Sequence, residues 1–599
     1  MTGDRRQIIL IIYNFSDMEN NALLNEVLAK AQIWLDGNYD TETKEAVRRM
    51  IDAEDKTELI ESFYRDLEFG TGGLRGIMGA GTNRMNIYTV GAATQGLSNY
   101  LKAQFGNLPQ ISVVIGHDCR NNSRKFAEIS ADIFSANGIK VYLFEDLRPT
   151  PEISFAIRHF GCQSGIILTA SHNPKEYNGY KAYWNDGAQM IAPHDENVIS
   201  EVTKITNVND IKFNGNPDLI EIIGEEVDKL FIEKIKTLIL SPGSIKRNND
   251  MKIVFTPIHG TAVKLVPWAL KEYGFTNIIH VPEQDVVSGN FPTVYSPNPE
   301  EPAALDMAIK RAIETDAELV MATDPDSDRM GIAIKDDKNQ WILVNGNQTA
   351  LLFVYYLIRR WKELGRLKGK EYVVKTIVTT EIIKEIAERN GVVCFDCYTG
   401  FKWIAGVIRE NEDKMDYIGG GEESYGFLPE TFVRDKDGVS SCTLMAEIAA
   451  WAKDNGKTLY QLLQDIYLEY GYGKEKGISV VRKGKSGAEE IQQIMSDFRS
   501  NPPKELAGSA IKIIKDYKTL KQTNVATGKV IDLDMPATSN VLQYFTEDGT
   551  KISVRPSGTE PKIKFYIEVR GDMQSRADYD AADAAANKKI EAARASLGV

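Results

Sequence analysis

The sequence is short of cysteine, of long apolar runs and of positive charge, and each shortage excludes a class of protein. Five cysteines in 599 residues cannot form a disulfide framework, so we expect a reducing, cytoplasmic compartment. No run approaches the roughly 18 apolar residues of a membrane-spanning helix, so we expect no membrane partner. The 84 acidic residues outnumber the 71 basic ones, and the net charge of −13 argues against broad, sequence-independent binding of nucleic acid.

Length and pattern indicate several α/β domains. At roughly 150 residues each, the 599 residues correspond to about four domains. Short apolar runs such as 111–116, 140–144 and 165–168 alternate with helix-like segments, among them 302–313, whose apolar side chains recur at helical spacing. Strands separated by helices imply parallel or mixed sheets covered on both faces. From about Tyr470 the pattern changes to charged helix plus short strands, which predicts a distinct C-terminal domain.

Polar stretches and the changes of pattern set the expected domain limits. Residues 1–17 precede an internal methionine, and their short apolar run has no signal-peptide cleavage site after it. We therefore expect a disordered extension there rather than a secretion signal. The four expected domains cover residues 18–212, 213–338, 339–468 and 469–599.

The most informative motif is the segment 169–181, TASHNPKEYNGYK. It follows a strand-like run, so Ser171 would lie just beyond the carboxyl end of a strand, where open α/β sheets bind ligands. A serine needs an activating group to do chemistry, and His172 and Lys181 are candidates for proton transfer. An ordinary loop with Asn-Pro and Asn-Gly turns explains the same residues, so composition alone leaves both interpretations open.

A second motif places three carboxylates directly after another strand-like run, at Asp324, Asp326 and Asp328. Alternate side chains of an extended chain are roughly 6.6 Å apart, and a curved backbone would let all three converge on one cation. Two carboxylates 4 Å apart repel by about 4 kcal/mol at an effective dielectric of 20, so a sheltered trio requires a divalent ion. Three hard oxygens favour magnesium or manganese over zinc. A solvated acidic turn is the alternative.

Two further loops carry groups suited to a sugar phosphate. In the glycine-rich turn 419–426, Glu422 and Ser424 could bond sugar hydroxyls, although a plain glycine turn fits equally well. In the segment 553–562, Arg555 can grip a phosphate with two hydrogen bonds; a loop at a sheet edge is the alternative. Three neighbours could complete an anion-binding nest: Ser557, Gly558 and Thr559.

Two weaker motifs add less. Cys394 and Cys397 have redox spacing but lie in a strand-like run without a second pair, so we expect them to be core cysteines. The glycine-rich segment 70–76 lacks the Gly-Lys-Ser/Thr of a P-loop. Its Arg75 is nevertheless placed to contact an anion.

Together, the four loops resemble, in order along the chain, the signature loops of the α-D-phosphohexomutase superfamily of phosphoglucomutases and phosphomannomutases. The similarity runs from about Trp34 to Tyr566, and the segment 69–76 and the total length are most similar to the longer branch with phosphopentomutase-like members. The resemblance implies an α/β fold of four domains around a central cleft. Three of them would have related mixed α/β sheets, and the C-terminal one would be α+β.

The resemblance also implies an isomerase, an intramolecular phosphotransferase that moves a phosphate between O1 and O6 of a hexose. Ser171 would be a phosphoserine that hands its phosphate to the sugar and takes the other one back from a bisphosphorylated intermediate. The three aspartates and Ser171 would hold one Mg²⁺ per chain, with glucose 1,6-bisphosphate as activator. The partner would be a small sugar phosphate, and the chain would be a monomer or a homodimer.

The charge count of the site and the same resemblance together suggest roles for individual residues. Arg75, Lys181 and Arg329 would offset the negative charge, and Lys181, in preference to His172, would take the hydroxyl proton. The expected substrate-binding residues are Glu422, Ser424, Lys402, His259, Arg555, Ser557, Gly558 and Thr559.

The identity of the sugar is less constrained. Glucose is the first expectation, mannose the second and a pentose the third, because glucose and mannose differ only at C2 and one hydrogen bond there decides between them. Tyr425 in the glycine-rich turn stands where many members of the superfamily have a small residue. A metal-dependent sugar phosphatase and a non-catalytic binding protein are the rival functions. The additional phosphate-binding residues around Arg555 argue against the phosphatase, because hydrolysis of a phosphate ester does not need a second phosphate-binding site.

Overall fold

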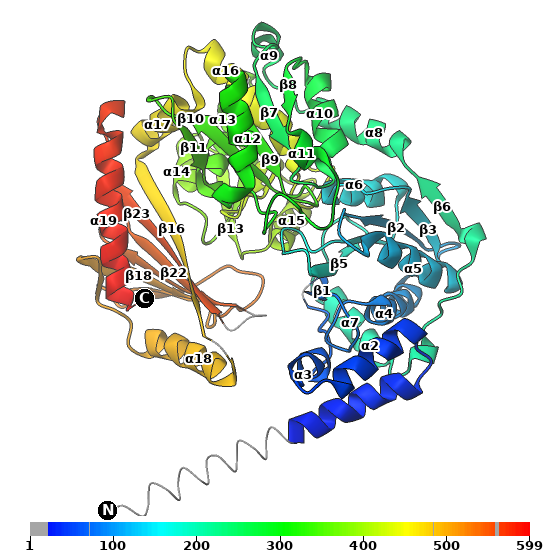
Figure 1. The fold of residues 1–599 in the computed structure, drawn as a ribbon. Coiled ribbons are helices and arrows are strands. Elements are labelled where there is room, and N and C mark those ends of the chain that lie inside the picture. The colour runs from blue at the N-terminus through cyan, green and yellow to red at the C-terminus, as the bar shows by residue number, and fades with distance from the viewer. Residues whose placement is uncertain (1–21, 71, 483, 558–561, 599) are drawn as a thin grey trace, which may run out of the picture. The chain divides into compact units, whose positions relative to one another are not determined.

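The computed structural model of the chain describes residues 22–70, 72–482, 484–557 and 562–598 (Figure 1). The predicted extension 1–17 lies outside them. The chain forms two compact units, each assembled from separate stretches of sequence. Unit 1 contains residue 22 to Ile239, Asn249–Gly331 and Glu430–Thr443. Unit 2 contains Leu240–Asn248, Ile332–Pro429 and Leu444 to residue 598.

The first sheet of unit 1 has six strands in the order β1-β5-β4-β2-β3-β6. It is mixed, as predicted, because β4, β2, β3 and β6 are parallel while β5 runs antiparallel to β4 and to β1. Helix α5 packs on β2 and β3, and α6 packs on β2 and β4. The elements are β1 (Gly73–Ile77), α4 (Ile87–Phe105), β2 (Ser112–His117), α5 (Ser123–Ala136), β3 (Lys140–Phe144), α6 (Thr150–Phe160), β4 (Ser164–Leu168), β5 (Tyr177–Trp184), α7 (His194–Thr203) and β6 (Ile220–Ile223).

Helices before this sheet form a small core of their own. A helix over residues 22–36 packs with α2 (Thr41–Asp52) and α3 (Thr57–Phe63) around the buried Trp34. Asp40 begins α2 by accepting a hydrogen bond from the backbone N–H of Thr43, as an N-cap aspartate is expected to do. None of the described helices is long and apolar enough to cross a membrane.

A second group of parallel strands in unit 1 has the order β9-β7-β8. The helix predicted over 302–313 is confirmed as α12, with Pro302 at its first turn and with Leu305, Ala308 and Ala312 buried. The elements are α8 (Glu225–Lys236), β7 (Ile253–Thr256), α10 (Ala262–Tyr273), β8 (Ile278–His280), α11 (Pro282–Asp285), α12 (Pro302–Thr315) and β9 (Leu319–Thr323).

Unit 2 contains another mixed sheet, in the order β13-β12-β14-β15. β12 is parallel to β13 and β14, and β15 is antiparallel to β14. The two antiparallel strands are joined through the glycine-rich turn 419–426, which is called the sugar loop below. Cys394 and Cys397 both lie in β13 as free thiols. The other elements are α9 (Pro242–Arg247), β10 (Met330–Lys335), β11 (Trp341–Val344), α13 (Gly346–Glu363), β12 (Glu371–Thr376), α14 (Ile382–Arg389), β13 (Val393–Cys397), α15 (Phe401–Asn411), β14 (Asp416–Gly421), β15 (Phe427–Leu428) and α17 (Leu459–Tyr470).

The C-terminal part of unit 2 is a large antiparallel sheet, which confirms the change of pattern predicted at about Tyr470. Its strands follow the order β16-β23-β22-β21-β18-β19-β20, with β17 paired to β18. Helix α19 packs on β16, β17 and β23. The elements are β16 (Tyr472–Val481), α18 (Gly484–Ser500), β17 (Glu505–Leu506), β18 (Ser509–Asp516), β19 (Lys521–Asn524), β20 (Val530–Asp532), β21 (Leu542–Thr546), β22 (Lys551–Pro556), β23 (Lys562–Gly571) and α19 (Tyr579–Leu597).

Candidate active site

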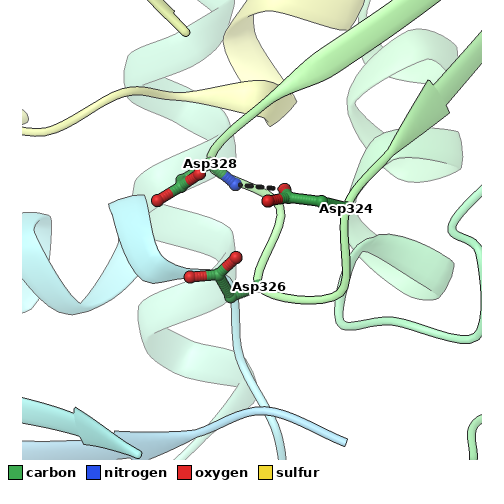
Figure 2. A group of neighbouring side chains, drawn as sticks. All are labelled: Asp324, Asp326 and Asp328. Carbon is green, nitrogen blue, oxygen red and sulfur yellow. Dashed lines mark hydrogen bonds between the residues drawn. The ribbon is translucent and has the colours of Figure 1, made fainter. Parts of the chain in front are cut away.

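The loop after β9 brings the three predicted aspartates together. One carboxylate oxygen from each of Asp324, Asp326 and Asp328 lies within 4.8 Å of the others, and all three side chains are buried (Figure 2). Asp324 Oδ1 accepts hydrogen bonds from the backbone N–H groups of Asp328 and Arg329, at 3.2 and 3.1 Å, which ties the loop into a tight turn. Ser327, in the left-handed region with φ 56°, supplies the bend.

The acidic trio has the electrostatics of a cation site. Burial, together with the charges of Asp326 and Asp328, raises the pKa of Asp324 well above its ordinary value. Burial would also raise the pKa of Asp328, but the nearby ammonium groups of Lys181 and Lys436 hold it below its usual range. Among the described residues, Oδ1 of Asp326 and Oδ1 of Asp328 accept no hydrogen bond. Buried oxygens without donors are costly, and a divalent cation would satisfy both.

Ser171 lies in the loop after β4, beside the trio. Its Oγ donates a hydrogen bond to Asp324 Oδ2 at 2.9 Å, and its side chain is buried. The residue has φ 52°, a left-handed conformation that non-glycine residues adopt at a cost and that collects at functional sites. Arg120 fixes the loop by donating to the carbonyl oxygens of Ser171, Pro174 and Tyr177, at 2.7, 2.9 and 3.0 Å.

Two of the predicted cations surround the serine. Arg75, on β1, donates to Asn173 Oδ1 at 3.1 Å, and Arg329 donates to His172 Nδ1. His172 Nδ1 also lies 3.2 Å from Ser171 Oγ. Burial, reinforced by the charges of Arg329 and Arg75, lowers the pKa of His172 well below its ordinary value. The imidazole is therefore neutral, and the guanidinium groups are the positive charges beside the serine.

Lys181 reaches the trio from β5. Its Nζ lies 2.6 Å from Asp326 Oδ2 and 2.9 Å from Asp328 Oδ2. Burial opposes its charge, but the two carboxylates raise its pKa above the ordinary value. Thr150, at the start of α6, adds a hydrogen bond to Asp326 Oδ2 at 2.9 Å. In this geometry Lys181 is an ammonium that balances charge.

Lys436 is a member of this site that sequence reasoning missed. It belongs to the segment Glu430–Thr443 of unit 1, and its Nζ lies 3.2 Å from Asp328 Oδ2. The only sequence signal was the dense run of charges Arg434-Asp-Lys-Asp. Such a run usually indicates a solvated loop, whereas here all four residues are buried.

His259 is held by its own neighbourhood in unit 1. Its Nδ1 pairs with the carbonyl of Val286 at 2.7 Å and its Nε2 with Thr293 Oγ1 at 2.8 Å. Both ring nitrogens are therefore engaged within the loops after β7 and α11. The geometry gives His259 a part in shaping those loops, and its predicted assistance to the substrate stays a prediction.

The predicted sugar loop lies in unit 2, between β14 and β15. Glu422 is buried and accepts a hydrogen bond from the backbone N–H of Gly400 at 2.7 Å. Glu423 accepts from the hydroxyls of Thr376 and Thr379, at 3.0 and 3.1 Å. Ser424 is half-buried at the tip. Hydrogen bonds from the end of β12 and from the loops after β12 and β13 thus fix the loop's conformation.

Gly346, at the start of α13, allows this loop its close approach. A Cβ there would lie 2.0 Å from the carbonyl oxygen of Glu423 and 2.8 Å from the backbone nitrogen of Tyr425. Tyr425 itself has φ 67°. Lys402 lies in the first turn of α15, two residues after Gly400, whose N–H bonds Glu422. Its Nζ is 5.2 Å from the ring centre of Trp403.

The predicted phosphate loop also lies in unit 2. Arg555, on β22, is directly opposite Lys564 on β23, and the backbone N–H of Ser557 donates to the carbonyl of Lys562 at 2.8 Å. Like charges directly opposite one another destabilise a sheet, so an anion would stabilise this pair. Two other predicted ligands, Gly558 and Thr559, lie outside the described residues.

Tyr566, in unit 2, is close enough to feel the charges of both the sugar loop and Arg555 on β22. Burial raises the pKa of its phenol, and the carboxylates of Glu423 and Glu422 raise it further, while Arg555 lowers it. The pKa of Tyr566 therefore depends on charges in the sugar loop and on Arg555. In short, the predicted residues form two sets, one around Ser171 and the acidic trio in unit 1 and one around Glu422 and Arg555 in unit 2.

Family models of known domains match the chain in four consecutive stretches. Those of the phosphoglucomutase/phosphomannomutase α/β/α domains I, II and III match residues 66–209, 229–338 and 345–470, and that of the C-terminal domain matches 479–586. The chain therefore belongs to the phosphoglucomutase/phosphomannomutase family, which confirms the predicted superfamily and its four-domain α/β fold.

Relatives of known name agree with the family. The phosphoglucomutase of Staphylococcus haemolyticus (strain JCSC1435) is 36% identical over 538 residues, or 89% of this chain and 96% of the relative. That of Staphylococcus aureus (strain MRSA252) is 37% identical over 542 residues, or 90% and 95%. The chain is accordingly a sugar-phosphate mutase, an intramolecular phosphotransferase, as the loops predicted.

Solved structures show the same fold at low identity. The crystal structure of parafusin, a phosphoglucomutase from Paramecium in an open form, is 19% identical with a TM-score of 0.65, over 89% of this chain and 95% of that one. A phosphoglucomutase/phosphomannomutase family protein from Burkholderia thailandensis is 19% identical with a TM-score of 0.63, over 88% and 97%.

Proposed function

We propose that the chain interconverts hexose 1-phosphate and hexose 6-phosphate, with glucose as the preferred sugar, through a phosphorylated Ser171 and a bisphosphorylated intermediate. The observation that carries the proposal is the 2.9 Å hydrogen bond from Ser171 Oγ to Asp324 in a buried acidic trio, which puts a nucleophilic oxygen beside a cation site. The names of the relatives support glucose over mannose and over a pentose.

One Mg²⁺ per chain would be held by Asp324, Asp326 and Asp328, with an oxygen of phosphorylated Ser171 completing the set. The donor set fits, because all the groups are hard oxygens and two of the carboxylate oxygens have no hydrogen-bond donor among the described residues. When bound, the ion would stabilise negative charge on the transferring phosphoryl group. Glucose 1,6-bisphosphate is the proposed activator, since it would phosphorylate a dephosphorylated serine.

The protein's own cations do the remaining electrostatic work. The trio and a phosphoserine of charge about −2 exceed the charge of one divalent ion, and Lys181, Lys436 and Arg329 lie beside the trio or the serine to offset the excess. Phosphoryl transfer asks a protein mainly for positioning and charge stabilisation. Lys181 and His172 are the two proposed acceptors of the proton from the attacking hydroxyl: in this geometry ion pairs hold the ammonium of Lys181, and Arg329 donates to Nδ1 of neutral His172.

In unit 2, Glu422 and Ser424 would bond the sugar hydroxyls, with Lys402 beside them. Arg555 and Ser557, together with Gly558 and Thr559, would hold the phosphate that is not being transferred. We also propose that His259 assists substrate binding. The chain is proposed to be cytoplasmic and to be a monomer or a homodimer. The domain limits 18–212, 213–338, 339–468 and 469–599 are proposed for dissecting the chain.

Phosphorus NMR of the purified protein with Mg²⁺ and a catalytic amount of glucose 1,6-bisphosphate tests the function. Glucose 1-phosphate, mannose 1-phosphate and ribose 1-phosphate are supplied in separate tubes. We expect conversion to the 6- or 5-phosphate, fastest with glucose and without inorganic phosphate. Release of inorganic phosphate would identify a phosphatase, and no conversion of any sugar would identify a binding protein.

Ser171→Ala tests the phosphoserine. Its turnover should fall to background while the sugar phosphate still binds, because only the acceptor oxygen is lost. Ser200→Ala is the matched control, since Ser200 is an exposed serine on α7 of the same unit, and should keep full activity. Undiminished turnover in Ser171→Ala would remove the serine from the mechanism.

A further inference from the structure

A tyrosine next to the acidic trio has no role in the mechanism described so far. Tyr183 follows Lys181 on β5 by two positions, so both side chains leave the strand on the same face. Its hydroxyl donates to Asp435 Oδ2 at 2.8 Å, and neither residue is more than 1% exposed. This hydrogen bond attaches the segment Glu430–Thr443 to the strand that carries Lys181.

The other oxygen of Asp435 holds Lys436. Asp435 Oδ1 accepts from the backbone N–H of Lys436 at 2.8 Å and from its Nζ at 3.0 Å. The same Nζ lies 3.2 Å from Asp328 Oδ2. One continuous series of contacts therefore leads from the phenol of Tyr183 through Asp435 and Lys436 to a carboxylate of the trio.

The geometry points to Tyr183 and Asp435 as positioning residues that hold the ammonium of Lys436 against Asp328 during phosphoryl transfer. This inference rests on the proposed mutase function. A lysine side chain has four rotatable bonds and loses considerable rotamer entropy when fixed. Asp435 provides the opposite charge that fixes it. Tyr183 occupies one carboxylate oxygen and so leaves the other to face the lysine.

The position of the ammonium matters because of what surrounds it. Asp328 Oδ2 is shared by Lys436 and Lys181, at 3.2 and 2.9 Å. In a buried site, fixed charges act strongly on a transferring phosphoryl group and need not reorganise during the reaction. A displacement of about 1 Å can cost on the order of 100-fold in rate. Loss of the Tyr183 hydroxyl should therefore slow the chemical step more than it weakens sugar binding.

A purely structural role would look different. If Tyr183 only anchored the segment Glu430–Thr443, its loss would lower stability whether or not Lys436 were present. If Tyr183 acts through Lys436, its loss should have no further effect on turnover once the lysine is gone. A double-mutant cycle separates the two.

The experiment measures kcat and KM for glucose 1-phosphate at saturating Mg²⁺ and glucose 1,6-bisphosphate in the full chain. The variants are Tyr183→Phe, Lys436→Met and the two combined. We expect Tyr183→Phe to lower kcat about tenfold, the loss of one buried hydrogen bond to a charged group, with KM within about twofold. In the Lys436→Met background the same substitution should change kcat less than twofold.

Tyr180→Phe is the matched control. Tyr180 lies on the same strand, is fully buried, and accepts a hydrogen bond from Thr94 at 3.3 Å. Within the described part of the chain, its hydroxyl bonds neither the trio nor Lys436. Its kcat should stay within twofold of the wild type. Asp435→Asn, taken through the same cycle, provides a second variant in case Tyr183→Phe does not fold.

Equal effects of Tyr183→Phe with and without Lys436, or a Tyr183→Phe variant with the kcat of the wild type, would overturn the positioning role. In both cases the wild-type chain still converts glucose 1-phosphate. A wild-type chain without mutase activity would instead refute the proposed function, so the two failures are distinguishable.

Discussion

Replacement of Lys181 by methionine tests whether the acidic trio needs a cation. Lys181 is 7% exposed, and its Nζ lies 2.6 and 2.9 Å from two of the carboxylates. At an effective dielectric of 20, a unit charge pair at these distances is worth about 6 kcal/mol before desolvation. Removing one partner of a buried ion pair typically costs about 3–5 kcal/mol. Methionine retains most of the side chain's volume, so the loss should come mainly from the charge.

Magnesium should reverse much of that loss. In the wild-type chain the ammonium and the metal ion stabilise the same carboxylates, whereas in Lys181→Met the ion acts without that competitor. A ligand at 100 times its dissociation constant stabilises the folded state by about 2.7 kcal/mol. The variant should therefore gain more stability from Mg²⁺ than the wild type does.

Thermal unfolding in EDTA and in excess Mg²⁺ measures both effects. At about 2 °C per kcal/mol for a large domain, we expect Lys181→Met to unfold about 6–10 °C below the wild type in EDTA, with a smaller gap in Mg²⁺. Lys236→Met is the control. Its ion pair with Glu272 at 2.9 Å is exposed, and such pairs contribute less than about 1 kcal/mol.

Two results would refute the reasoning. A Lys181→Met variant as stable as the wild type in EDTA would show that the trio does not need the ammonium. Equal stabilisation of both proteins by Mg²⁺ would show that the ion does not bind at these carboxylates.

Two further predictions concern unit 2. Gly346→Ala should raise KM for the sugar phosphate at least about tenfold, because its Cβ would lie 2.0 Å from the carbonyl oxygen of Glu423 and displace the sugar loop. Steady-state kinetics measure this effect, with Gly477→Ala as the control because nothing lies within 4 Å of the carbon added there. An unchanged KM in Gly346→Ala would contradict the prediction. Glu447→Gln should flatten the pH dependence of stability, because burial raises the pKa of Glu447 from 4.5 to about 7. The stability that the protonated carboxyl contributes below pH 4.5 is therefore lost as the pH rises through 7. Thermal unfolding at pH 5 and 8 should show the wild type losing up to about 3 kcal/mol more than the variant over that interval, and parallel curves would contradict the assignment.

Much of unit 1 could be predicted because its signals are local. Alternating aspartates after an apolar run indicated a loop at a strand end, and β9 places them there. Helical spacing predicted α12 and its buried face. Even so, Ile313 at the same spacing is 63% exposed, because it lies outside the face of the helix that buries Ala304, Leu305, Ala308 and Ala312.

The contact between Tyr183 and Asp435, which sequence reasoning missed, is long-range, because the two residues are 252 positions apart. A charged run such as the one around Lys436 has the same composition in solvent as in a core. Only the tertiary structure decides between the two, because burial of a charge depends on which partner the fold brings to it.

The path of the chain through Glu430–Thr443 has a consequence for building chimeric enzymes. The sugar loop ends at Gly426, and the chain enters the segment that supplies Lys436 to the trio only a few residues later. A graft with boundaries at 339 and 468 would therefore exchange the sugar loop and Lys436 together. The lysine beside the recipient's metal-site aspartates would then come from the donor enzyme. A graft that ends at Pro429 would change the sugar-contacting residues alone and leave the host's own phosphoryl-transfer centre intact.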